Sequence, residues 1–244
     1  MVEPGQEALA RALDHLLDHL IVALDVPSYG AATALVAGLP QVKWWKVGLE
    51  LYLAVGSPIL ELLHRHGKKI FLDVKLHDIP TTVAGATRIL AQQGIDFLTV
   101  HATGGIPMLQ AAQAATVGTP CRLLGVTLLT SLSGEELHQH LRVGDPPLDY
   151  VQHLARVCQQ VGIPGVVCSP QEAAAVRQTC DRNLIIVTPG IRLRPGTDDQ
   201  ARTCTPAQAR QQGASFIVVG RPITQARDPQ AALLAFAQDW HKTG

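Results

Sequence analysis

The chain has 244 residues, of which 47% are hydrophobic, and its 20 basic residues balance 20 acidic ones. A formal net charge of zero gives no general attraction to nucleic acid or to an anionic membrane, so any bound anion needs a local site. The longest apolar runs are strand-sized, far short of the roughly 20 residues of a membrane span. Residues 1–7 lack the basic start and apolar core of a signal peptide, which predicts a cytoplasmic location.

Short apolar runs alternate with helix-like segments along the chain, and each run predicts a strand. A first helix is expected over residues 6–17. The predicted strands are, in chain order, 20–26, 44–49, 70–75, 97–101, 121–129, 165–168, 184–187 and 216–219. Segments rich in Ala, Leu, Gln and Glu lie between them and predict helices, as at 57–66, 81–93, 148–161 and 171–180.

This alternation indicates the fold class. Strands that are apolar throughout and alternate with helices imply a parallel sheet covered on both faces. Eight such units in under 250 residues favour a closed (β/α)8 barrel over an open doubly wound sheet. No linker interrupts the pattern, so we expect a single domain over residues 1–244, with the first helix capping the barrel's lower mouth. Either fold places reactive groups at the C-terminal ends of strands.

Charged residues stand at the end of the third predicted strand, where Asp73, Lys75 and Asp78 follow an apolar run. On a regular strand, positions i and i+2 face the same side, so Asp73 and Lys75 should point together into the barrel. Lys46 on the second strand and Asp25 after the first should stand beside them. Such a group could be a structural salt bridge. Alternatively, alternating charges keep a lysine protonated, and that lysine can protonate a developing carbanion.

A phosphate site is the second signal. Gly220 and Arg221 follow the eighth predicted strand, and residues 188–192 end the seventh with a similar glycine-containing turn. Glycine lets backbone N–H groups approach an anion, and arginine offers two parallel donors. One such turn alone is more often only a turn. Two on neighbouring strands, at a common phosphate position of barrels, predict a phosphate site.

The loop over residues 192–203 is polar and has no apolar period. Beside a phosphate site it could close as a lid, with Arg192 or Gln200 touching the ligand. A plain exposed loop is the equally balanced alternative.

No motif indicates a metal site or a disulfide. The five cysteines are odd in number and include no C-x-x-C pair, and two lie in apolar runs where a reduced thiol acts as a small hydrophobe. The histidines show no ligand spacing, and no H-E-x-x-H is present. We therefore expect no metal site.

Residues 73–83, D-V-K-L-H-D-I-P-T-T-V, resemble the signature of the orotidine 5′-phosphate decarboxylase family. The resemblance extends over nearly the whole chain, in the order and spacing of the bacterial form, through residues 23–25, 46–48, 129–131, 167–169, 188–192 and 219–223. It implies that the protein releases CO2 from orotidine 5′-phosphate to give UMP in pyrimidine nucleotide synthesis, without metal or organic cofactor.

The resemblance also implies a role for each site residue. Lys75 would protonate C6 of the pyrimidine ring, Asp73 would sit against the substrate carboxylate, and Lys46 would complete the charge array. Asp78 would reach into the neighbouring subunit's site with Ile79 and Thr82, which implies a homodimer with composite sites. The other substrate-binding residues would be Asp25 at the ribose, Thr130 and Ser169 at the pyrimidine, Pro189, and the phosphate-binding Arg192, Gln200, Gly220 and Arg221.

Two other functions fit these residues. Related barrels that share D-x-K-x-x-D act on sugar phosphates with magnesium, so a magnesium-dependent sugar-phosphate decarboxylase or aldolase is one alternative. Those enzymes carry a glutamate where this chain has Lys46, and a lysine there replaces a metal ligand by a cation. The second alternative is a non-catalytic binder of a nucleotide phosphate. No nucleic-acid or membrane partner is expected.

Overall fold

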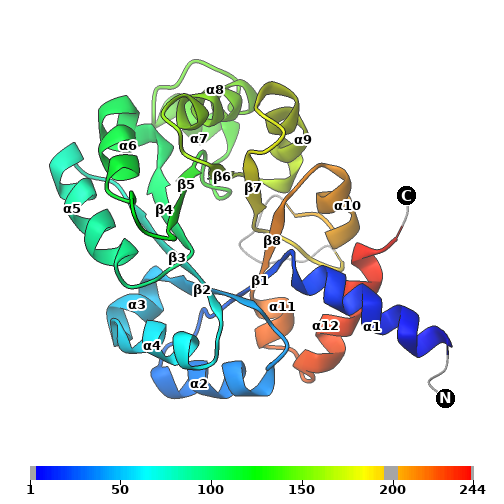
Figure 1. Cartoon of the computed structure of the whole chain (residues 1–244). Coiled ribbons are helices and arrows are strands. Elements are labelled where there is room, and N and C mark those ends of the chain that lie inside the picture. Colours follow the sequence, from blue (N-terminus) through cyan, green and yellow to red (C-terminus); the bar gives the residue numbers. More distant parts are fainter. Residues whose placement is uncertain (1–3, 195–202, 243–244) are drawn as a thin grey trace.

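The structure, a computed structural model, describes residues 4–194 and 203–242. Eight parallel strands close into a barrel in chain order, with β8 hydrogen-bonded to β1 and helices around the outside (Figure 1). The predicted (β/α)8 barrel is confirmed. The strands are β1 Leu20–Ala23, β2 Trp44–Gly48, β3 Lys69–Leu76, β4 Phe97–His101, β5 Arg122–Val126, β6 Gly165–Val167, β7 Ile185–Thr188 and β8 Phe216–Val219.

Proline and capping residues set where many of the helices begin. Ser169 and Thr205 each stand before a proline and form capping boxes that start α9 and α10. No helix in the described part of the chain is long and apolar enough to cross a membrane. The helices are α1 Pro4–Leu17, α2 Tyr29–Gly38, α3 Leu49–Val55, α4 Pro58–Arg65, α5 Pro80–Ala91, the 3-10 helix η1 Ala102–Gly104, α6 Gly105–Ala114, α7 Gly134–Gln139, α8 Pro147–Gln160, α9 Pro170–Thr179, α10 Pro206–Gln211, α11 Arg221–Thr224 and α12 Pro229–Trp240.

The alternation of side chains along the strands divides the core in two. Outward-facing residues pack against the helices, and inward-facing ones fill the barrel. Inside, Trp44 stacks on Phe97 with ring centroids 4.7 Å apart, and Phe216 lies 5.1 Å from Trp44. Because residues i and i+2 of a strand face the same way, the residues two positions later form the next inward layer. That layer lies at the C-terminal rim, meaning the strand ends and the loops that follow them.

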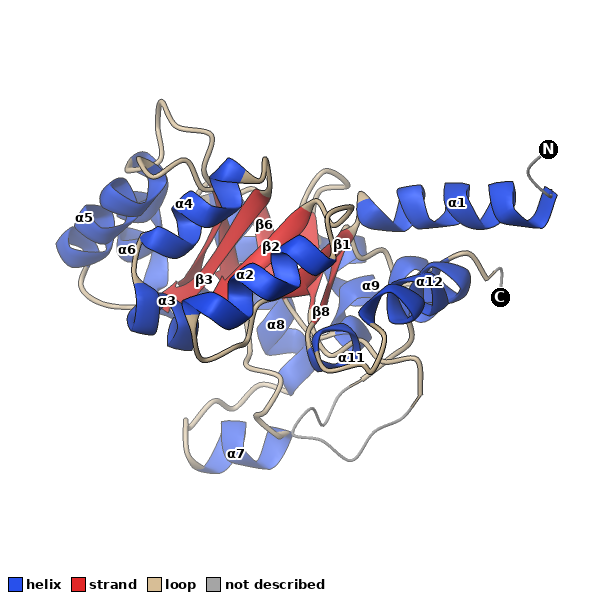
Figure 2. Cartoon of the chain, turned by 90° about the horizontal axis from the view of Figure 1, so that it is seen from below, coloured by secondary structure: helices blue, strands red, loops and turns tan. Residues whose placement is uncertain are grey.

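The first helix does not cap the barrel, so this expectation was wrong. α1 packs along α12, and its N-terminal part projects away from the barrel (Figure 2). Leu16 and Leu17 at its end are buried, whereas Ala8 and Ala10 are exposed. The barrel interior is already filled by aromatic rings, so the apolar face of α1 is buried against α12 instead. The single domain over residues 1–244 includes termini outside the described residues and stays a prediction.

Candidate active site

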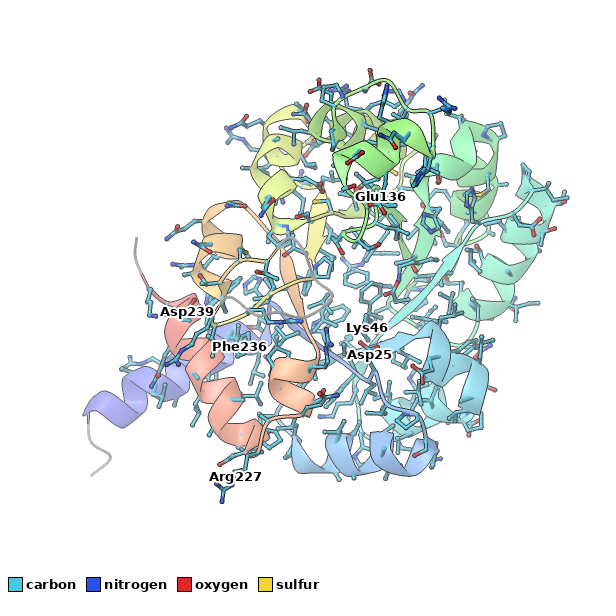
Figure 3. All side chains as sticks on the ribbon, turned by 180° about the vertical axis from the view of Figure 1, so that it is seen from behind. Asp25, Lys46, Glu136, Arg227, Phe236 and Asp239 are labelled. Carbon is cyan, nitrogen blue, oxygen red and sulfur yellow. The ribbon has the colours of Figure 1, made fainter. Side chains whose placement is uncertain are left out.

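Four charged side chains, from β2, β3 and the segment that follows β1, meet at the C-terminal rim, and we call them the charge array: Asp25, Lys46, Asp73 and Lys75. Lys46 Nζ lies 2.8 Å from Asp25 Oδ1 and 3.8 Å from Asp73 Oδ2. Lys75 Nζ donates to both carboxylate oxygens of Asp73 at 2.9 Å. Figure 3 shows Asp25 and Lys46 together within the ring of strands. The predicted side-by-side arrangement of alternating charges is confirmed.

Asp73 is the centre of the charge array, and its side chain is only 14% exposed. Burial alone would raise the pKa of this carboxyl. The charges of Lys46 and Lys75, with hydrogen bonds from Lys75 and Thr99, outweigh burial and hold the pKa below its usual value. The site therefore keeps a fixed negative charge between two lysines at neutral pH.

We expected β3 to alternate regularly up to its end, and this expectation was wrong. β3 and β4 lose their register after Leu72 and resume pairing at Leu76, so a bulge of three residues faces Thr99 alone. Lys75, in the bulge, has a φ of 51°, a left-handed conformation that costs a non-glycine residue about 1–3 kcal/mol. Its backbone N–H donates to Thr99 Oγ1 at 2.9 Å, and the Thr99 hydroxyl donates to Asp73 Oδ1 at 3.0 Å. Lys75 thus meets Asp73 through a bulge and not through strand alternation.

A cavity of about 420 Å³ opens at the charge array. The predicted Thr130, Pro189, Arg192, Gly220 and Arg221 all line it. The structure therefore brings most of the predicted substrate-binding residues to one opening. The full lining is Ala23, Asp25, Lys46, Phe71, Asp73, Lys75, Val126, Leu128, Leu129, Thr130, Val167, Cys168, Pro189, Gly190, Arg192, Val218, Gly220, Arg221 and Gln225.

Asp78, Ile79 and Thr82 are not among the residues that line this cavity. All three are exposed after the end of β3, and Ile79 is 65% exposed. The Oδ1 of Asp78 accepts a hydrogen bond from the Ile79 N–H at 2.6 Å, which begins the turn into α5. These side chains are presented on the protein surface beside the strand that carries Lys75.

Ser169 and Gln200 stand apart from the other predicted residues. Ser169 is fully buried and its hydroxyl caps α9 by accepting from the backbone N–H of Gln171, while the adjacent Cys168 lines the cavity. Gln200 lies outside the described residues, as does most of the predicted lid.

The residues that sequence reasoning missed are Thr99, Gly48 and Gln225. Thr99 stands two positions after Phe97 on β4, so strand alternation could have placed it in the inward layer. Gly48 leaves room for the charge array, since a Cβ there would lie 3.0 Å from Asp25 Oδ1 and 3.1 Å from Lys46 Nζ. Gln225 lines the cavity one helical turn after Arg221. Nothing in the isolated sequence marks Gln225.

The cysteines have no visible part in this site beyond Cys168. All five are free thiols, and burial raises the pKa of Cys121 and of Cys158 to about 12. Both thiols therefore stay protonated at neutral pH. Across residues 4–194 and 203–242, no group of three or more His, Cys, Asp or Glu side chains could hold a metal ion.

Comparison with known proteins finds relatives over most of the chain. The model of the "Orotidine 5'-phosphate decarboxylase / HUMPS family" matches residues 18–236. A protein named orotidine 5′-phosphate decarboxylase from Thermosynechococcus vestitus is 51% identical, over 87% of this chain and 92% of its own. One of the same name from Moorella thermoacetica is 44% identical, over 92% of this chain and 93% of its own.

Solved structures agree with the sequence relatives. The crystal structure of orotidine 5′-phosphate decarboxylase from Lactobacillus acidophilus has a TM-score of 0.81 and 37% identity, and the match covers 92% of this chain and 100% of that one. That of an uncharacterized conserved protein from Geobacillus kaustophilus has a TM-score of 0.79 and 36% identity, over 91% of this chain and 100% of its own.

Proposed function

Because this chain belongs to the orotidine 5′-phosphate decarboxylase / HUMPS family, we propose that it converts orotidine 5′-phosphate to UMP and CO2 in pyrimidine nucleotide synthesis. The family description joins two groups, whereas the curated relatives compared above carry only the decarboxylase name. The observation that carries the proposal is the charge array at the mouth of the cavity. Within this array, Lys46 occupies the position at which the magnesium-dependent sugar-phosphate enzymes are expected to carry a glutamate.

The proposed chemistry divides between Asp73 and Lys75. The substrate carboxylate would lie against the ionised Asp73, and two like charges about 4 Å apart repel by about 4 kcal/mol at an effective dielectric near 20. Loss of CO2 leaves an electron pair on C6, which takes a proton from the Lys75 ammonium. The 2.9 Å contacts between Lys75 and Asp73 support this assignment because they hold the acid beside the departing group.

The proposed binding mode uses the rest of the cavity. Arg221 and Gly220, at the start of α11, and Arg192, after β7, would hold the phosphate with Gln200 from the predicted lid. Asp25, half-exposed and paired with Lys46, would meet the ribose hydroxyls. Thr130 would lie at the pyrimidine with Ser169, next to Pro189. The cavity volume of about 420 Å³ falls in the range of small-molecule sites.

We also propose that two copies of the chain form a homodimer in which Asp78, Ile79 and Thr82 complete the partner's site. Support comes from exposed apolar side chains on segments that follow β2, β3 and β4. Leu49 is 52% exposed, Leu53 76%, Ile79 65% and Ile106 37%. Large apolar side chains gathered on one side of a barrel are typical of a protein interface. Asp78 is exposed and does not line the cavity of its own subunit, so in such a dimer it could extend into the cavity of the partner subunit.

A spectrophotometric assay with orotidine 5′-phosphate tests the proposal. We expect the orotate absorbance band to disappear on addition of the protein, at the same rate with and without EDTA. Activity abolished by EDTA would favour the magnesium-dependent alternative. Tight UMP binding without any change in absorbance would favour the non-catalytic binder. The cytoplasmic location stays part of the proposal.

A further inference from the structure

We propose that Thr99 is a positioning residue, whose hydroxyl sets Lys75 and Asp73 relative to one another before substrate binds. The inference rests on the proposed function, because it assigns Lys75 and Asp73 to the reaction. It concerns a residue of β4 that does not line the cavity and that acts only through its two neighbours on β3.

The Thr99 hydroxyl joins both members of the reacting pair. It donates its proton to Asp73 Oδ1 at 3.0 Å and accepts the backbone N–H of Lys75 at 2.9 Å. A hydroxyl has one proton to donate and lone pairs to accept, so the two bonds use it in both directions at once. Thr99 is fully buried, so water does not compete for either bond.

The bulge in β3 explains why a side chain is needed here. Because the pairing of β3 with β4 stops at Leu72 and resumes only at Leu76, Lys75 has no paired residue on β4. An N–H that is shielded from water without a partner is costly, and the Thr99 hydroxyl is the acceptor that the Lys75 N–H uses. The same bond holds Lys75 in its left-handed conformation, with φ at 51°.

Threonine suits this task because its branched Cβ restricts χ1, so the strand backbone fixes the direction of the hydroxyl. β4 itself is held firmly below this point. Phe97, two residues earlier on the same face, is stacked on Trp44 and fully buried. The rigid aromatic layer is thereby connected through Thr99 to the carboxylate of Asp73 and the backbone of Lys75.

The alternative is a purely structural role, in which Thr99 only fills buried space. Thr116 provides a matched control, because it is 6% exposed and its hydroxyl donates to the backbone oxygen of Gln113 at 2.8 Å, at the end of α6. Replacing either threonine by valine removes one buried hydroxyl. Only at Thr99 does that hydroxyl contact the charge array.

The first experiment measures turnover and UMP affinity for Thr99→Val, Thr99→Ser and Thr116→Val. We expect Thr99→Val to lower kcat about 10²-fold, the effect of misplacing reacting groups, with UMP affinity within about twofold of the wild type. Thr99→Ser, which keeps the hydroxyl, should recover most of the rate, and Thr116→Val should keep it. Wild-type kcat in Thr99→Val, or equal losses in the serine and valine variants, would overturn the proposal.

The second experiment follows the carboxyl of Asp73 by carbon-13 NMR as pH is lowered. Thr99→Val removes a hydrogen bond to the ionised form, so the pKa of Asp73 should rise, while Thr99→Ser should leave it near the wild-type value. An unchanged titration in the valine variant would overturn the proposal. If Thr99→Val does not fold, the same comparison is made between Thr99→Ala and Thr99→Ser.

Turnover and the titration of Asp73 test the role of Thr99 separately from the proposed function. A wild-type protein that does not decarboxylate orotidine 5′-phosphate would refute the proposed function. The titration of Asp73 would still decide whether the Thr99 hydroxyl holds that carboxylate.

Discussion

The ammonium group of Lys46 lies 2.8 Å from the carboxylate of Asp25, and this ion pair packs directly against a glycine. The glycine is Gly48, and an added Cβ there would lie 3.0 Å from Asp25 Oδ1 and 3.1 Å from Lys46 Nζ. Gly48 has a φ of −82°, which alanine adopts without strain. The ion pair, and not the backbone, would have to move.

Gly48→Ala should therefore disturb the charge array without unfolding the barrel. We expect kcat/KM to fall roughly tenfold, because small displacements of positioned groups are costly to turnover. Gly38→Ala is the matched control, since a Cβ at that exposed glycine meets nothing within 4 Å. Steady-state kinetics with thermal unfolding curves measure both effects. Equal activity in the two variants would show that the Lys46–Asp25 geometry has no part in the reaction.

Lys75→Ala removes the proposed proton donor. Turnover should fall by at least about 10²–10⁴-fold, the usual contribution of a general acid, while UMP still binds. Lys43→Ala, which removes a lysine paired with Asp18 outside the cavity, should keep full activity. Rate measurements and calorimetric titration with UMP separate chemistry from binding. Near-normal turnover of Lys75→Ala would exclude the proton-donor role.

Mixing inactive variants tests whether Asp78 is shared between subunits. Lys75→Ala and Asp78→Ala proteins, each of low activity alone, should regain about a quarter of wild-type activity when their subunits exchange, because half of the dimers are mixed and each has one intact site. Lys75→Ala mixed with the Lys75→Ala/Asp78→Ala double variant should recover nothing. The sharing model predicts this difference, and equal rates in the two mixtures would reject it.

The contact between α1 and α12 should depend on pH. The indole Nε1–H of Trp240 donates to His15 Nδ1 at 3.0 Å, which requires a neutral imidazole. Burial lowers the pKa of His15 below its ordinary value of 6.5. Charge interactions with His19, His241 and Arg210 lower it further, against a smaller opposite effect of Asp18. As pH falls, His15 therefore takes up a proton more readily when α1 is undocked than when α1 is packed on α12. Docking is therefore favoured above pH 6.5 and weakens as pH falls below it.

Hydrogen exchange of the α1 amides measures this dependence. Protection of α1 should be lower at about pH 5.5 than at about pH 7.5 in the wild type. In His15→Gln, which cannot be protonated, the difference should shrink. Equal protection of wild-type α1 at the two pH values would contradict the prediction.

Much of the barrel follows from local pattern. β4 and β8 lie where the sequence predicts them, because each is an unbroken apolar run bounded by polar or turn residues. β1 was expected to extend to residue 26 but ends at Ala23. Leu24 is fully buried although it lies beyond the strand, so burial in a loop produces the same apolar signal as pairing in a sheet.

The charge array could be predicted because it needs only strand alternation and the order of neighbouring strands. Asp25, Lys46 and Asp73 each stand two residues after an inward apolar residue of the layer below, so the sequence by itself determined which side chains meet. The tertiary structure decided how they are held. The bulge that turns Lys75 toward Asp73, the hydroxyl of Thr99 that secures both, and the packing of α1 on α12 all join residues distant along the chain. Such contacts depend on the register between strands and on the shape of packed surfaces, which no local pattern of residues encodes.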